Sequence, residues 1–193
     1  MSDKPLLLIG GLAPRDRDRL RDFALRLNAP VYAEPLSGLR EDAQLAAIRL
    51  RNERILTTAG FTRIIRIGNV PTLRFWRDLD AASIPVTSYS ALPFRGLSRG
   101  EVHPLDELPD LDPVDRDEFL FARDCKQSDA LDRILDVEPE SELALVRGIS
   151  RDLAPGTRVY LGNSLPVREW DLVATREDRG FVIEANRGAN GLD

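Results

Sequence analysis

The first ninety residues alternate short apolar runs with amphipathic segments, and this alternation constrains the fold most strongly. Residues 6–9 are apolar throughout and end in Gly10-Gly11, as expected of a strand buried on both faces of a sheet. Similar runs follow at residues 31–33, 64–67 and 84–87. Because parallel strands need long crossovers, usually helices, between them, the pattern predicts an α/β fold: a parallel Rossmann-like sheet with helices on both faces.

The segments between these runs carry helix signals. Pro14 suits the first turn of a helix, and apolar residues spaced by three and four follow it until Asn28, namely Leu20, Phe23, Ala24 and Leu27. We expect a second helix through Leu45 and Ile48, and a third that starts near Pro71. Each predicted helix then connects two successive strands.

A change of composition predicts the end of this domain. Residues 104–117 hold three prolines among many acidic residues, which is typical of a linker. Helices are expected at about residues 115–136, with a break near 125–128, and at 141–153; strands are expected at 158–161 and 181–185. Two strands do not make a complete sheet. We therefore predict a central α/β domain at 1–103, a linker at 104–117, and a truncated second α/β unit at 118–193.

Composition excludes several classes of function. The net charge of −5 and pI of about 5.1 argue against a nucleic-acid binder. No apolar run approaches the ~20 residues of a membrane span, and the N-terminus lacks the features of a signal peptide. One cysteine and one histidine, His103, offer little for a metal centre or a histidine-based triad. We therefore expect a cytoplasmic protein and assign no catalytic residue and no metal ligand.

Two glycine-containing turns are weak candidates for ligand binding. Gly10-Gly11 follows the first strand, but the Gly-x-Gly-x-x-Gly pattern of dinucleotide-binding turns is absent, which favours a tight turn without a ligand. Residues 68–72 leave amide groups available at a helix start and suit an anion. A capped helix is the simpler interpretation of that segment.

A polar turn at residues 161–168 is a stronger candidate. Asn163 and Ser164 directly follow a predicted parallel strand, and ligands of open α/β sheets bind at the carboxyl ends of strands. Arg168 lies about one helical turn further on and can reach back. Arginine suits carboxylate and phosphate ligands because its planar guanidinium donates paired hydrogen bonds. The alternative is that Asn163 and Ser164 only cap the next helix.

A second polar turn at residues 186–193 follows the next predicted strand and contains Arg187. If the two strands are adjacent and parallel, both turns leave the same edge of the sheet. Such convergence favours a site for a ligand with several negative charges over two independent helix caps.

The two turns also carry a family resemblance. Gly-Asn-Ser-Leu-Pro-Val-Arg at 162–168, followed by Asn-Arg-Gly-Ala-Asn-Gly-Leu-Asp at 186–193, resembles the start of the diphosphate-binding domain of the MenD family. These are thiamine-diphosphate-dependent 2-succinyl-5-enolpyruvyl-6-hydroxy-3-cyclohexene-1-carboxylate synthases of menaquinone and phylloquinone biosynthesis. The segments at 6–11, 31–40 and 66–72 resemble the central domain of the same family.

This resemblance implies roles for the residues of both turns. Asn163, Arg168 and Arg187 would contact the carboxylates and polar groups of isochorismate or of the adduct derived from 2-oxoglutarate. Ser164 would lie near the cofactor, and Leu192 would hold the thiamine in its bent shape. The parent enzyme, a homo-oligomer that uses thiamine diphosphate and Mg²⁺, decarboxylates 2-oxoglutarate and adds the resulting carbanion to isochorismate.

Two parts of the family pattern have no counterpart in the sequence. These are the pyrimidine-binding domain with its activating glutamate, and the Gly-Asp-Gly … Asn segment that holds Mg²⁺ and diphosphate. The chain is therefore expected to be a fragment that is inactive alone and binds no cofactor. The alternative is a free-standing, non-catalytic binding or scaffold module with the fold of a central domain of thiamine-diphosphate enzymes.

Overall fold

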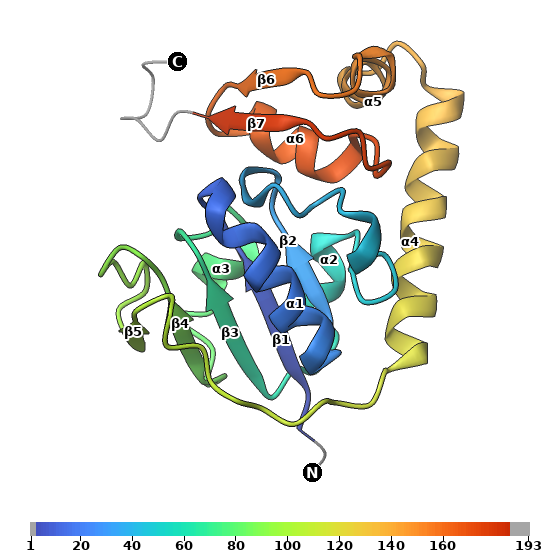
Figure 1. The fold of residues 1–193 in the computed structure, drawn as a ribbon. Coiled ribbons are helices and arrows are strands. Elements are labelled where there is room, and N and C mark those ends of the chain that lie inside the picture. Colours follow the sequence, from blue (N-terminus) through green and yellow to red (C-terminus); the bar gives the residue numbers. More distant parts are fainter. Residues whose placement is uncertain (1–2, 186–193) are drawn as a thin grey trace.

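The computed structural model describes residues 3–185 and contains two parallel sheets joined by a long helix (Figure 1). The first sheet has the order β2-β1-β3-β4-β5, and all its neighbouring strands are parallel. Its strands are β1 (Pro5–Ile9), β2 (Val31–Ala33), β3 (Arg63–Ile67), β4 (Val86–Tyr89) and β5 (Glu101–His103). The predicted parallel α/β class is confirmed, whereas β5 was not foreseen from the sequence.

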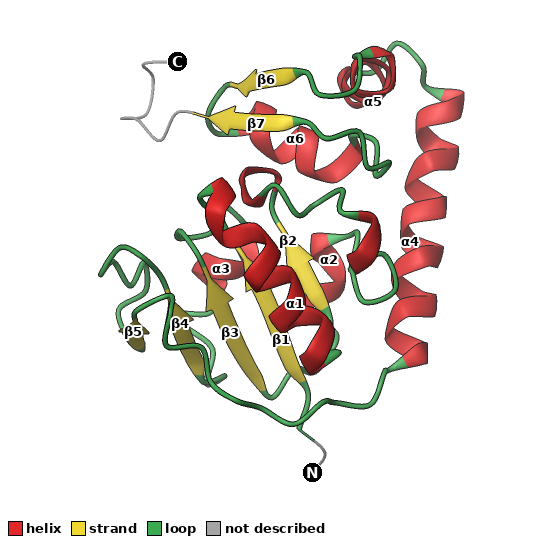
Figure 2. Cartoon of the chain, viewed as in Figure 1, coloured by secondary structure: helices red, strands yellow, loops and turns green. Residues whose placement is uncertain are grey.

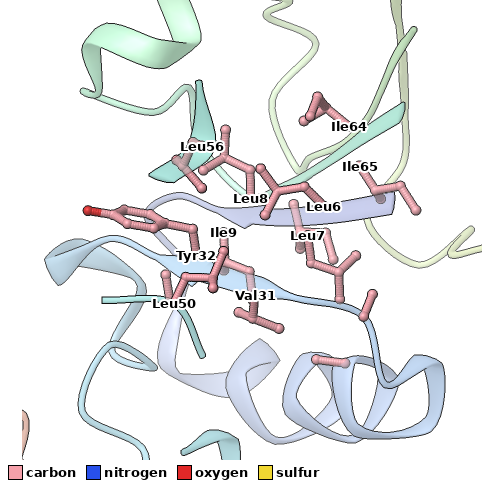
Figure 3. Close-up of a cluster of buried hydrophobic side chains, with 14 of the residues drawn as sticks. Leu6, Leu7, Leu8, Ile9, Val31, Tyr32, Leu50, Leu56, Ile64 and Ile65 are labelled. Carbon is pink, nitrogen blue, oxygen red and sulfur yellow. The ribbon is translucent and has the colours of Figure 1, made fainter. Parts of the chain in front are cut away.

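Strand β1 forms the centre of this sheet because its side chains are apolar on both faces. Leu6, Leu7, Leu8 and Ile9 are each 0% exposed, and successive side chains of a strand point to opposite faces. Figure 3 shows these residues packed with side chains of β2, β3 and the neighbouring loops. Burial on both faces therefore explains why the first apolar run is continuous and does not alternate with polar residues.

Helices lie on both faces of the first sheet (Figure 2). The 3₁₀ turn η1 (Pro14–Asp16) leads into α1 (Arg17–Leu27), which ends at Asn28 with a φ of 56°. This left-handed residue is a frequent way to end a helix, and it confirms the predicted stop. The short helices α2 (Glu53–Leu56) and α3 (Arg74–Asp78) lie on the opposite face from α1.

The helix predicted through Leu45 and Ile48 is wrong. The chain forms only two 3₁₀ turns here, η2 (Pro35–Ser37) and η3 (Ala43–Leu45), and then continues in an extended conformation. The amide of Val31 donates to the carbonyl of Ile48 at 2.8 Å, and the amide of Leu50 donates to the carbonyl of Val31 at 2.8 Å. Pairing with the edge strand β2 therefore replaces the helical hydrogen bonds that the local pattern favours.

We call the five-stranded sheet with its helices the first unit. The second unit begins with α4 and is separated from the first by residues 104–117, which form no helix or strand. Its elements are α4 (Glu118–Val137), α5 (Glu142–Asp152), β6 (Arg158–Leu161), α6 (Leu165–Val173) and β7 (Val182–Ala185). Strands β6 and β7 pair in parallel. Helix α4 is continuous through residues 125–128, so the predicted break is wrong.

Helix α4 packs against the first unit as well as against the rest of the second unit, as Figure 1 shows. Leu120 and Phe121 belong to the core of the first sheet, whereas Leu135 packs with α5 and α6 residues. The carboxylate of Asp124 accepts hydrogen bonds from the amides of Arg51 and Asn52 at 2.9 and 3.0 Å. Across residues 3–185, no helix combines the length and the apolar character needed to cross a membrane.

Candidate functional site

The turn between β6 and α6 lies at the carboxyl edge of the second sheet. Leu161 at the end of β6 is paired with Ala185 at the end of β7, so the residues that follow each strand leave the same edge. Ser164 has a φ of 66° and a ψ of −101°, a backbone conformation that non-glycine residues rarely adopt. Such strain is concentrated at functional sites, where the surrounding structure holds it in place.

Arg168 folds back over this turn, as the sequence predicted. Its Nε donates to the carbonyl oxygen of Ser164 at 2.8 Å, and one terminal nitrogen donates to the Ser164 hydroxyl at 3.3 Å. Both side chains are exposed. The Ser164 side chain makes no capping hydrogen bond to α6 although it occupies the N-cap position. The capping alternative is therefore wrong for Ser164.

The other helix start considered from the sequence is capped by two carboxylates. The amide of Thr72 donates to Oε1 of Glu34 at 2.6 Å, and the amide of Phe75 donates to Oε1 of Glu53 at 2.8 Å. These side chains occupy the amide groups at the start of α3. Residues 68–72 therefore form part of a capped helix start, which was the simpler interpretation of their sequence.

Glu53 also connects this helix start electrostatically to the candidate turn. Burial raises the pKa of the Glu53 carboxyl, whereas the Phe75 amide and, more weakly, the positive charge of Arg168 lower it. The charge of Arg168 therefore favours the ionised form of Glu53, a residue of the first unit.

A cavity of about 300 Å³ lies between the carboxyl edges of the two sheets. It is lined by Gly11, Leu12, Glu34, Leu36, Asn69 and Val70 from the first unit and by Ile183, Glu184 and Ala185 from β7. A Cβ atom at Gly10 would lie 2.1 Å from the carbonyl oxygen of Asn69, so Gly10 permits the close crossing of two turns. This contact supports the interpretation of Gly10-Gly11 as a tight turn.

The predicted site residues are only partly within the described region. Asn163 and Ser164 lie in the turn and Arg168 in α6, from which its side chain contacts Ser164, whereas Arg187 and Leu192 lie outside the described residues. The single histidine, His103, stacks on the ring of Tyr89 with centroids 5.3 Å apart. Sequence reasoning missed Arg40, Tyr32 and Asp171, which meet at the opposite end of α6.

Mg²⁺ and thiamine diphosphate each make demands on the residues that hold them. Divalent cations such as Mg²⁺ require several oxygen ligands, and residues 3–185 contain no group of three or more Asp, Glu, His or Cys side chains that could hold a metal ion. We therefore name no metal ligand among these residues. The polar turn with Arg168 fits an anionic ligand, such as a carboxylate or a phosphate.

The fold and the turn together define a class of protein. A parallel five-stranded sheet followed by a parallel β6–β7 unit, with a polar turn at its carboxyl edge, corresponds to the α/β Rossmann-like fold of thiamine-diphosphate enzymes. The comparisons with known proteins identify a family within this class. No protein-family model matches the chain.

Several curated proteins are similar to the chain over nearly its whole length. The 2-succinyl-5-enolpyruvyl-6-hydroxy-3-cyclohexene-1-carboxylate synthase of Bdellovibrio bacteriovorus is 35% identical over 98% of this chain, and that of Akkermansia muciniphila is 38% identical over 97%. The synthase of Halorhodospira halophila is 28% identical over 97% of the chain. The matches cover 38%, 37% and 36% of these relatives. The chain therefore matches one continuous segment of synthases of the MenD family and spans little more than a third of the length of these relatives.

Proposed function

We propose that this chain supplies the central domain and the first part of the diphosphate-binding domain of a 2-succinyl-5-enolpyruvyl-6-hydroxy-3-cyclohexene-1-carboxylate synthase. The names of the relatives and their similarity over nearly the whole chain support this proposal. The proposed boundaries are a central domain at 1–103, a linker at 104–117 and the start of the next domain at 118–193. The family resemblance also implies a homo-oligomer in the cytoplasm.

The observation that carries the proposal is the position of Arg168. It lies at the carboxyl edge of two parallel strands, folded over the strained Ser164 turn. Ligands of open α/β sheets bind outside this edge. Both proposed substrates, 2-oxoglutarate and isochorismate, carry carboxylates, which are the natural partners of a fixed guanidinium.

The chain's own residues would bind and orient the substrates. Arg168 and Arg187 would donate charge-assisted hydrogen bonds to substrate carboxylates, and Asn163 would add a polar contact. Fixed positive charges of this kind both position a reactant and stabilise the negative charge that develops during reaction. Thiamine diphosphate, when bound near Ser164 and Leu192, would supply the electron sink for decarboxylation of 2-oxoglutarate.

We expect this chain alone to be inactive and to bind thiamine diphosphate with Mg²⁺ weakly. The relatives are more than twice as long as the matched segment, and the sequence contains no Gly-Asp-Gly segment. Isothermal titration calorimetry of the chain with both ligands measures the affinity. A dissociation constant near 1 μM, about −8 kcal/mol, would contradict this prediction.

Substitution of the two arginines in the complete synthase tests the site. Arg168→Ala or Arg187→Ala should each remove a charge-assisted bond of roughly 1.5–3 kcal/mol, and so lower kcat/KM about ten- to hundredfold. Lysine at either position should restore only part of the loss, because an ammonium group lacks the paired donors of a guanidinium. Steady-state kinetics with each substrate measures the effect.

Arg133→Ala is the matched control, because Arg133 is exposed on α4 and far in sequence from the turn. It should leave kcat/KM unchanged and alter stability by less than about 0.5 kcal/mol. Thermal melts confirm that each variant is folded. If kcat/KM for both substrates is unchanged in both Ala variants, Arg168 and Arg187 do not bind substrate, and the proposed site is wrong.

A further inference from the structure

Arg40 from the first unit holds the end of α6 that lies opposite the candidate turn. Its side chain is 0% exposed. One terminal nitrogen donates to the carbonyl of Thr175 at 3.0 Å, and the other lies 2.9–3.1 Å from three carbonyl oxygens, those of Trp170, Asp171 and Ala174. The guanidinium also forms ion pairs with the carboxylates of Glu41 and Asp171. One side chain thus binds four carbonyl groups at and just beyond the last turn of α6.

A buried helix end requires hydrogen-bond donors for its carbonyl groups, and Arg40 supplies them. The last four carbonyl groups of a helix have no partner within it, and here those of Asp171 and Ala174 accept hydrogen bonds from Arg40. A guanidinium has five donors in one plane and a positive charge that complements the negative end of the helix dipole. Lysine at this position would offer a compact ammonium that cannot reach the same set of acceptors.

The rest of the interface fixes the same helix end. The Tyr32 hydroxyl donates to Oδ2 of Asp171 at 2.6 Å, and burial, followed by the charge of Asp171, raises the pKa of this phenol, so it remains the donor. Arg176 donates to the carbonyls of Arg51 and Asp171 at 2.6 and 2.8 Å. The carboxyl end of α6 is therefore bound to the first unit by a network of polar contacts, of which those of Arg40 and Tyr32 are buried.

Helix α6 transmits this contact to the candidate turn. It contains nine residues, about 13 Å at 1.5 Å per residue, and Val167 and Trp170 pack its inner face into the core of the second unit. A short, packed helix moves as a rigid body. A shift of its carboxyl end therefore displaces the turn that carries Ser164 and Arg168, and a misplacement of 1 Å can cost about a hundredfold in rate.

We propose that Arg40 is a positioning residue of the synthase: by capping the carboxyl end of α6 from the first unit, it sets the position of the Asn163–Arg168 turn. This inference rests on the proposed function of that turn. Arg40 itself touches no substrate in this scheme. It acts through α6.

The contact itself is tested by hydrogen–deuterium exchange on this chain. Arg40→Met should accelerate exchange of the α6 amides at least tenfold relative to those of β1, and Arg40→Lys should have a smaller effect. Arg66→Met is the matched control, because Arg66 is equally buried but contacts Phe94 and the Trp76 ring. It should not accelerate exchange of the α6 amides relative to those of β1. Unchanged α6 protection in Arg40→Met would overturn the inference.

The positioning role is tested by kinetics of the complete synthase, with Arg168→Ala measured in parallel. Arg40→Met should raise the KM for the substrate bound at Arg168 about tenfold, and Arg40→Lys should restore part of the loss. If Arg40 only stabilises the fold, its replacement reduces the fraction of folded enzyme, which lowers the apparent kcat and leaves KM unchanged. If Arg168→Ala raises KM but Arg40→Met does not, the positioning role is overturned and the proposed function stands. If Arg168→Ala also has no effect, the proposed function fails, and the inference fails with it.

Discussion

The two parallel sheets of this protein differ in how they are buried. Every side chain of β1 is buried, and helices lie on both faces of its sheet. On β6, by contrast, Tyr160 is 61% exposed, and Arg158 pairs with Glu184 of β7 on an exposed face. Parallel sheets are normally buried on both faces. The first sheet is therefore stabilised by its own core, whereas the second depends more on contacts with the first unit.

The largest expected effect comes from the core of the first sheet. Leu8→Ala should lower the free energy of unfolding by about 2–5 kcal/mol, because it leaves a cavity in a fully buried strand. Tyr160→Ala, the counterpart on β6, should cost less than about 0.5 kcal/mol because the side chain is mostly exposed.

Urea denaturation measures both changes, and the two tryptophans report on the two units separately. Trp76 lies in α3 of the first unit and Trp170 in α6 of the second, and both are buried. Single-tryptophan variants, Trp76→Phe and Trp170→Phe, assign each transition. Equal losses in Leu8→Ala and Tyr160→Ala would contradict the contrast between the sheets.

An intermediate effect is expected at the contact between α4 and the first unit. Asp124→Ala should cost about 1–3 kcal/mol, because two buried backbone amides lose their acceptor. Burial raises the pKa of Asp124 despite these hydrogen bonds. The folded state then binds the proton more tightly than the unfolded state, so this residue's contribution to stability falls as pH rises from about 3.9, the unfolded value, through the folded value.

Asp124→Asn removes this titration, and Asp117 provides the opposite case. Asp117 caps α4 by accepting from the Leu120 amide, and this bond lowers its pKa. Its contribution is therefore present above the unfolded pKa and is lost as pH falls through the folded value. Urea unfolding from pH 3 to 7 of Asp124→Asn and Asp117→Ala should show pH-dependent differences from the native chain of opposite sign. The same sign for both would contradict the assignment.

The smallest expected effect is on the exposed face of the second sheet. The ion pair between Arg158 and Glu184 spans 2.6 Å, but both side chains are exposed. Arg158→Ala should therefore cost about 0.2–1 kcal/mol, and the difference should shrink at high salt because solvent ions screen exposed charges. Denaturation at low and high salt measures this change. A loss of unfolding free energy as large as that of Leu8→Ala would show that this exposed ion pair makes a major contribution to the stability of the second sheet.

The parts of the fold that sequence analysis predicted are those fixed by local chemistry. The continuous apolar run of β1 and the stop of α1 at Asn28 depend on residues close together in the chain. The helix expected through Leu45 and Ile48 failed because its backbone pairs with Val31, a partner that local periodicity does not reveal. In α5 the apolar residues Leu145 and Ile149 are exposed, whereas Arg147 and Ser150 are buried.

The candidate site shows the same division. The return of Arg168 to Ser164 was predictable, because the two residues lie one helical turn apart. The positive φ of Ser164 was not, since no residue-type preference indicates it. Arg40 was also missed because its carbonyl acceptors in and just after α6 lie 130 to 135 residues away in sequence, and no local pattern predicts such a contact.

This separation in sequence sets an order for synthesis. At a translation rate of 5–20 residues per second, the ribosome needs roughly 7 to 26 s after adding Arg40 to reach Trp170, the first of its carbonyl acceptors. All five strands of the first sheet are completed within that interval, before the helix end that Arg40 binds has been made. The contact that joins α6 to the first unit can therefore form only after every strand of the first sheet has been synthesised.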